Sequence, residues 1–271
     1  MKKILFLVLA LPVFIACKTN SITGRKQLAL FPESTLQQQA LTEYQSFLSQ
    51  NKVVSGSTNR DADMVKRVGS RIAKAITEYY TGKGLGAELN GYKWEFNLVD
   101  SKEVNAWCMP GGKVVVYTGL LPITQNEAAL AVVLGHEITH AVAHHGNERM
   151  SQVAIAQGFE IAGNIFTSGN QKANALFSNV FAPTAQVVVL LPNSRNQEYE
   201  ADHLGLLFAA MAGYNPREAV PFWQRMAKAG ENTQKPPEFL ATHPNDQNRI
   251  AKLQEYMPEA LSYYKPLRPG N

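Results

Sequence analysis

Cysteine is scarce in this chain, which has only Cys17 and Cys108 among its 271 residues. Cys17 stands at the end of a segment that resembles a targeting signal, and we predict that lipidation consumes it. Cys108 then has no partner for an internal disulfide, so the fold does not depend on one, even in an exported protein.

The chain also lacks a hydrophobic run long enough to cross a bilayer. Its N-terminal run, residues 4–16, has thirteen residues, whereas a spanning helix needs about 20. Lys2 and Lys3 precede this run, and Phe14-Ile15-Ala16-Cys17 resembles a lipobox, in which cleavage occurs before the cysteine. We therefore predict a lipoprotein signal peptide at residues 1–16. The alternative is an ordinary secretory signal followed by a chance cysteine.

A lipidated Cys17 would anchor the chain to a membrane, because several acyl chains together bind a bilayer firmly. Residues 17–32 are polar and rich in turn formers, which is typical of a tether. Lys18 after the cysteine favours outer-membrane sorting. We therefore predict a location in a bacterial cell envelope, at the outer membrane and facing the periplasm.

No cluster of basic residues stands out in the sequence. The full chain has 26 basic and 22 acidic residues and a net charge of +4. Without Lys2 and Lys3 of the signal peptide, 24 basic residues remain against 22 acidic ones, so the net charge falls to +2. A near-neutral surface argues against a nucleic-acid partner.

Hydrophobic periodicity predicts an α+β fold that is predominantly helical. We expect helices over residues 33–48, 61–80, 128–145, 193–212, 216–229 and 246–256. We expect strands over residues 92–99, 105–109 and 113–118, the last two forming a hairpin. These elements make one domain, residues 33–260, in which 151–191 is a helical hairpin or lid, followed by a tail at 261–271.

The helix at residues 128–145 carries recognisable start and stop signals. Thr124 and Glu127 match a capping box, so we predict Thr124 as the N-cap. Gly146 is a plausible C-cap.

This helix contains His136-Glu137-Ile138-Thr139-His140. Histidines four residues apart lie on one face of a helix and can bind one zinc ion. Glu137 lies between them, free to accept a proton from water. The alternative is a core helix with surface histidines.

A catalytic zinc takes three protein ligands, so a third must come from elsewhere. A metzincin would have glycine at position 143 and histidine at 146, but this chain has Ala143 and Gly146. The segment SRNQEYEADHLG offers two glutamates. Glu198 shares a helix face with Asp202, which could support a ligating histidine, whereas Glu200 points away. We therefore predict Glu198 as the ligand.

The segments GHEITH, SRNQEYEAD and THPNDQNRI together resemble the gluzincin metalloendopeptidases of peptidase family M48. NAWCMPGGKVVVYTGLL resembles the strand region before the metal helix of that family, and the resemblance runs from about Asn20 to about Leu253. It implies a peptidase domain with a small β-sheet beside the HExxH helix and one Zn²⁺ per chain. The implied site has His136, His140 and Glu198 as ligands, Glu137 as base and Asp202 behind them.

The resemblance also suggests roles for His243 and Arg249. His243 is the best candidate to stabilise an oxyanion, and Arg249 could support the site or contact substrate. His243 could instead be a loop histidine, or a fourth ligand that holds the enzyme latent. Arg249 could equally form a structural salt bridge.

Other candidate residues surround this motif. The strand at 105–109 has a possible free edge, so we hypothesise that Asn105 helps to bind an extended substrate. The alternative is a purely structural sheet. We expect hydrogen-bonding roles for His144 and His145, and packing or surface positions for Cys108 and His203.

These features lead to two hypotheses of function. The first is a zinc metalloendopeptidase that cleaves unfolded or misassembled envelope proteins. The second is a chaperone-like or latent zinc-binding lipoprotein. A three-ligand set with an adjacent base favours the enzyme, because structural zinc sites are closed by a fourth ligand.

Overall fold

The computed structural model describes residues 17–55, 59–158, 171–181, 193–231, 237–243 and 248–267. The signal peptide predicted at residues 1–16 and large parts of the predicted lid at 151–191 lie outside these ranges. Within them, no helix combines the length and the apolar character that crossing a membrane requires.

A four-stranded sheet lies beside the central helices. Its strands follow the order β3 (Val53–Val54), β4 (Glu95–Val99), β6 (Lys113–Tyr117) and β5 (Ala106–Met109). β4 and β6 are parallel, whereas β5 and β6 are antiparallel, which confirms the predicted hairpin. β5 is therefore the last strand on its side of the described sheet.

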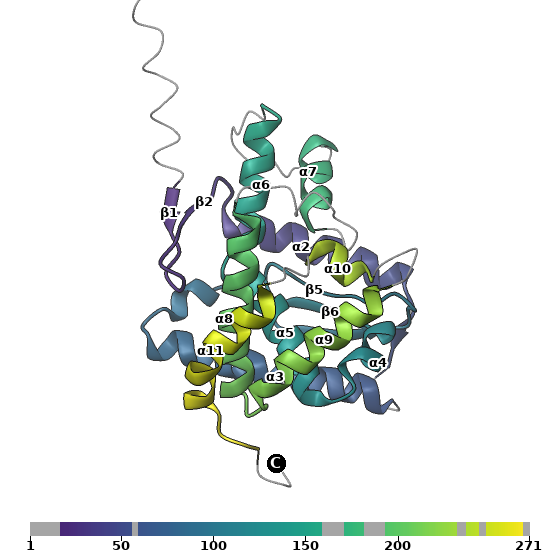
Figure 1. Ribbon diagram of the computed structural model, residues 1–271. Coiled ribbons are helices and arrows are strands. Elements are labelled where there is room, and N and C mark those ends of the chain that lie inside the picture. The colour runs from purple at the N-terminus through teal and green to yellow at the C-terminus, as the bar shows by residue number, and fades with distance from the viewer. Residues whose placement is uncertain are drawn as a thin grey trace, which may run out of the picture.

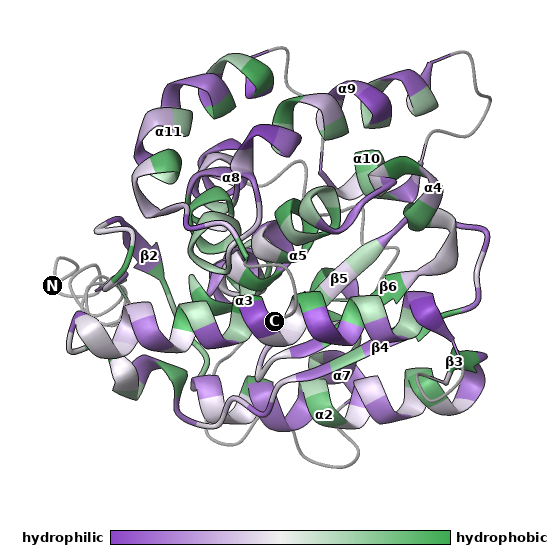
Figure 2. Cartoon of the chain, turned by 90° about the horizontal axis from the view of Figure 1, so that it is seen from below, coloured by the Kyte–Doolittle hydropathy of each residue, from purple (hydrophilic) through white to green (hydrophobic). Residues whose placement is uncertain are grey.

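Both faces of the sheet are covered, so every residue of β6 is buried. One face packs against α3 (Arg60–Gly82) and α5 (Glu127–Val142), through residues such as Val114 and Val116. The other face packs against α2 (Glu33–Gln50), through Val115 and Tyr117. Figure 2 shows the strands between α5 and α2.

Helix α5 is buried around almost its whole circumference and crosses α8 (Ser194–Met211) at very short distance. The crossing point is a pair of glycines: a Cβ on Gly135 would stand 2.4 Å from the carbonyl oxygen of Gly205. α11 (Arg249–Tyr263) lies along the other side of α8 (Figure 1). These contacts bring three sequence motifs together.

Both predicted capping residues of the metal-motif helix are wrong. Thr124 belongs to the short helix α4 (Leu121–Thr124), and Asn126 caps α5 instead, accepting a hydrogen bond of 2.9 Å from the amide of Ala129. The helix ends at Val142, because His144 adopts a left-handed conformation with φ 57°. Gly146 lies inside the next helix, α6 (His145–Ala156).

The segment interpreted as a tether, residues 17–32, includes a folded hairpin of β1 (Cys17–Thr19) and β2 (Lys26–Leu28). The other described helices are α7 (Gln171–Phe181), α9 (Ala219–Gly230), α10 (Glu238–Thr242) and the 3-10 turns Gly86–Leu89, Thr118–Leu120 and Pro216–Glu218. The structure confirms the predicted class, a mainly helical α+β fold with a small sheet.

Candidate metal centre

Four buried side chains from three segments converge beside the sheet. α5 supplies His136 and His140, α8 supplies Glu198, and His243 follows α10. One donor atom from each of these residues lies within 4.8 Å of all the others. The structure thus joins the predicted ligands and adds His243 to them.

Several separations between these donor atoms are close to those around a tetrahedral metal ion. His136 Nε2 lies 3.1 Å from His140 Nε2 and 3.2 Å from His243 Nδ1. The Glu198 oxygens lie 3.3 Å from the Nε2 atoms of His136 and His140, and 2.9 Å from His243 Nδ1. Ligand bonds of about 2.0–2.1 Å in a tetrahedron require ligand atoms about 3.3 Å apart.

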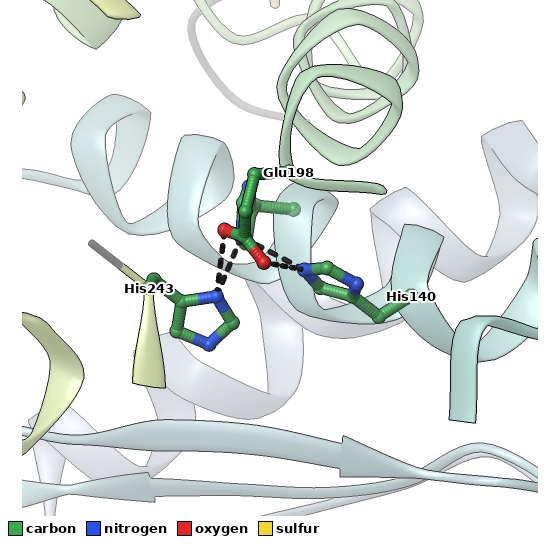
Figure 3. A group of neighbouring side chains, drawn as sticks. His140, Glu198 and His243 are labelled. Atoms are coloured by element: carbon green, nitrogen blue, oxygen red, sulfur yellow. Dashed lines mark hydrogen bonds and ion pairs between the residues drawn. The ribbon is translucent and has the colours of Figure 1, made fainter. Parts of the chain in front are cut away.

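Figure 3 shows how the Glu198 carboxylate faces two of the imidazoles. Its Oε1 is directed toward His140 and its Oε2 toward His243. One carboxylate thus contacts histidines from two other segments, so the donor set suits an ion that accepts both nitrogen and oxygen ligands.

Glu137 lies next to this cluster but outside the donor set. Within the described part of the chain its buried Oε1 has no hydrogen-bond partner, and His243 Nε2 lies 3.4 Å away. Burial raises the pKa of Glu137 from 4.5 to about 7, although the charge of His243 opposes this shift. A carboxyl group with that pKa can both accept and release a proton near neutral pH.

Asp202 lies where the sequence predicts, directly behind His136. Its Oδ1 is 2.9 Å from His136 Nδ1 and accepts a hydrogen bond of 2.7 Å from Arg249 Nη2. The Arg249 guanidinium stacks 3.4 Å from the ring centre of Trp223 and is almost fully buried. This placement favours support of the metal site over contact with substrate for Arg249.

Arg149 is a residue of this site that no motif in the sequence indicates. Its Nη2 lies 3.4 Å from Glu198 Oε1, and its Nε donates to Gln197 Oε1 at 2.7 Å. Arg149 is in α6, beyond the bend at His144, so no helical periodicity relates it to the motif. Only the packing of α6 against α8 reveals it.

A pocket holding about 710 Å³ of space, part of it open to solvent, adjoins the cluster. Its lining includes Asn105 and the β5 residues Ala106, Trp107 and Cys108 on one side, and Glu137, His140 and His243 on the other. The end strand of the sheet therefore borders the same space as the candidate base.

Comparison with known proteins identifies the family of these motifs. The sequence profile of peptidase family M48 matches residues 60–257. The chain is similar to the mitochondrial metalloendopeptidase OMA1 of Schizosaccharomyces pombe, with 36% identity over 174 residues, or 64% of this chain and 49% of that protein. It is also similar to the human mitochondrial metalloendopeptidase OMA1, with 29% identity over 258 residues, or 92% and 47%.

A third relative is the beta-barrel assembly-enhancing protease of Escherichia coli, with 28% identity over 185 residues, or 65% of this chain and 38% of that protein. The chain spans less than half of the length of each of these three relatives. The matches confirm the resemblance seen in the three motifs and the predicted class of metallopeptidase.

The comparisons contradict the predicted location at a bacterial outer membrane. The OMA1 relatives from fungi, a plant and animals are named as mitochondrial proteins. A short apolar run before a cysteine indicates targeting to a membrane, but it contains no chemistry that identifies which membrane. Cys17 itself is exposed, and its lipidation stays a prediction.

Proposed function

Because this chain belongs to peptidase family M48, we propose that it is a metalloendopeptidase that uses one Zn²⁺, bound by His136, His140 and Glu198. The donor cluster is the observation that supports this function, since two imidazoles and a carboxylate are a typical catalytic zinc set. When bound, zinc supplies Lewis-acid chemistry, polarising the scissile carbonyl and acidifying water.

The chain's own residues handle the proton. Glu137 accepts it on Oε1 from the attacking water and delivers it to the leaving amine. The raised pKa of about 7 suits both transfers. Asp202 accepts from His136 Nδ1, which leaves the Nε2 lone pair of that ring directed at the donor cluster.

Replacing the base tests this mechanism. Glu137→Gln keeps the shape of the side chain but removes the proton acceptor, so we expect casein cleavage to fall by about 10²–10⁴-fold. Zinc content, measured by mass spectrometry, should stay at the wild-type level. Glu127→Gln, at the first residue of the same helix, is the control and should cleave normally. Unchanged activity in Glu137→Gln would contradict the mechanism.

We propose unfolded or misassembled proteins as the substrates. An extended segment can pair with the backbone of β5 beside the pocket, and such pairing is independent of sequence. Asn105 lines that pocket immediately before β5. We expect Asn105→Ala to raise KM for an extended peptide, and an unchanged KM would count against this binding mode.

A latent or chaperone-like protein is the second candidate, and the position of His243 favours it. A fourth ligand would close the zinc site, and His243 Nδ1 lies among the donors. His243→Ala distinguishes the roles: cleavage rises if His243 closes the site and falls if it stabilises the oxyanion. His203→Ala, at the surface of α8, is the control. Equal rates for His243→Ala and wild type would contradict both roles.

A further inference from the structure

The N-terminal hairpin contacts the end of the metal-motif helix. Asn20 Nδ2 and Gln27 Nε2 both donate to the carbonyl oxygen of Ala143, at 2.8 and 2.9 Å. Both side chains are buried. The hairpin therefore fixes the bend between α5 and α6, which is the bend that places His145.

A chain of polar contacts runs from this hairpin to the metal ligand His140. Arg25 Nε donates to Glu200 Oε1 at 2.7 Å, and Glu200 Oε2 lies 2.8 Å from His145 Nε2. His145 Nδ1 in turn lies 2.8 Å from His140 Nδ1. His145 is completely buried. Arg25 also makes a two-pronged pair with Glu148, at 2.7 Å for each bond, which holds the guanidinium in place.

With both imidazoles neutral, these contacts allow one arrangement of the protons. The Glu200 carboxylate accepts, so His145 Nε2 carries a hydrogen and, in the neutral ring, Nδ1 is an acceptor. His140 Nδ1 must then be the donor, which leaves the lone pair of His140 Nε2 for the metal. Arg149 Nη2, 3.3 Å from His140 Nδ1, has no lone pair to accept that hydrogen, so His145 is the acceptor.

We propose that Arg25, Glu200 and His145 form a positioning relay that sets the tautomer and orientation of His140 and so increases the affinity for zinc. This inference rests on the proposed zinc site. It assigns a role to the N-terminal hairpin, which precedes the family match at residues 60–257. The two histidine ligands then differ: Asp202 supports His136 directly, whereas a second imidazole stands between Glu200 and His140.

Zinc affinity, measured by competition with a fluorescent chelator, tests the relay without using proteolysis. We expect Glu200→Gln and His145→Leu to weaken zinc binding by about 10–100-fold. His145→Asn should lose less, because its amide oxygen can replace Nδ1 as the acceptor. Visible absorption of the cobalt-substituted protein should change in Glu200→Gln and His145→Leu, since the orientation of one ligand changes.

Two matched controls separate this role from general loss of charge. Glu259→Gln removes the 2.7 Å contact between the Glu259 carboxylate and His203, which lies on α8 as Glu200 does. This variant should leave zinc affinity unchanged. Arg67→Gln breaks the arginine–glutamate pair with Glu127 and, as a control, should leave zinc affinity unchanged. Arg25→Gln, in contrast, should weaken zinc binding.

Wild-type zinc affinity and an unchanged cobalt spectrum in Glu200→Gln would overturn the relay, even if His145→Leu failed to fold. A wild-type chain that binds zinc tightly but cleaves no protein would contradict the proposed function and leave the relay standing.

Discussion

Two buried arginines flank the Glu198 carboxylate, one beside each oxygen. Arg149 Nη2 is 3.4 Å from Oε1 and Arg249 Nη2 is 3.6 Å from Oε2. Burial favours the protonated form of Glu198, but the interactions of its carboxylate with the His243, His140 and His136 imidazoles prevail and hold its pKa well below the ordinary value. The ligand is therefore ionised before any metal arrives, and the arginines keep the buried charge compensated.

Arg249→Met tests, at the residue scale, whether Arg249 compensates the buried carboxylates of Glu198 and Asp202. Methionine can still pack against Trp223, but Asp202 loses its 2.7 Å partner and stays buried. We expect the free energy of unfolding to fall by about 3–5 kcal/mol, because removing one member of a buried ion pair leaves an uncompensated charge. Urea unfolding in EDTA measures this free energy of unfolding.

Lys252→Met, at a partly exposed position on the same helix, is the control and should unfold at the wild-type urea concentration. A wild-type unfolding midpoint for Arg249→Met would show that the buried Asp202 carboxylate does not need Arg249 for the stability of the fold.

At the scale of elements, the centre depends on how closely α5 and α8 approach. Glu198 and Asp202 can reach the histidines because Gly135 and Gly205 bring two helix backbones into contact. A glycine inside a helix costs about 0.5–1 kcal/mol relative to alanine. The close crossing of α5 and α8 explains why glycine occupies positions 135 and 205.

Gly205→Ala should separate the helices. Its Cβ would lie 2.6 Å from the backbone nitrogen of His136, so α8 must shift and carry Glu198 away from the other donors. We expect a loss of about 1–3 kcal/mol in stability from overpacking, together with weaker zinc binding in a titration. Gly82→Ala is the control, since a Cβ at Gly82 meets no atom within 4 Å. Wild-type zinc affinity in Gly205→Ala would contradict this account.

At the scale of the whole molecule, the candidate ion would connect segments that are far apart in sequence. The donors come from α5, from α8, which packs directly against α5, and from the residue after α10. A ligand that binds only the folded chain stabilises it through mass action. Metal binding and global folding are therefore expected to be linked.

Removing the metal should lower the melting temperature. Free zinc at about 100 times Kd adds about 2.7 kcal/mol, which corresponds to a shift of about 5–10 °C for a chain of this size. Calorimetry of the zinc-loaded and EDTA-treated protein measures the shift. Glu198→Gln lacks one ligand and should show a smaller difference. An equal shift in that variant would place the stabilising ion elsewhere.

The sequence by itself determined the parts of the site that helical and strand geometry control. A spacing of four residues places His136 and His140 on one face, and the same rule selects Glu198 with Asp202 over Glu200. The turn residues Pro110-Gly111-Gly112 before a β-branched strand predict the β5–β6 hairpin. The chemistry of the motif follows from these local relations, because backbone periodicity fixes which side chains share a face.

The tertiary structure alone decided everything that joins distant segments. It placed His243 among the donors, Arg149 beside Glu198, Arg249 behind Asp202 and the Arg25–Glu200–His145 relay behind His140. It also moved the N-cap of α5 to Asn126 and ended the helix at Val142. No local periodicity relates residues on separate elements, so these contacts arise only when the glycine crossing and the sheet bring the elements together.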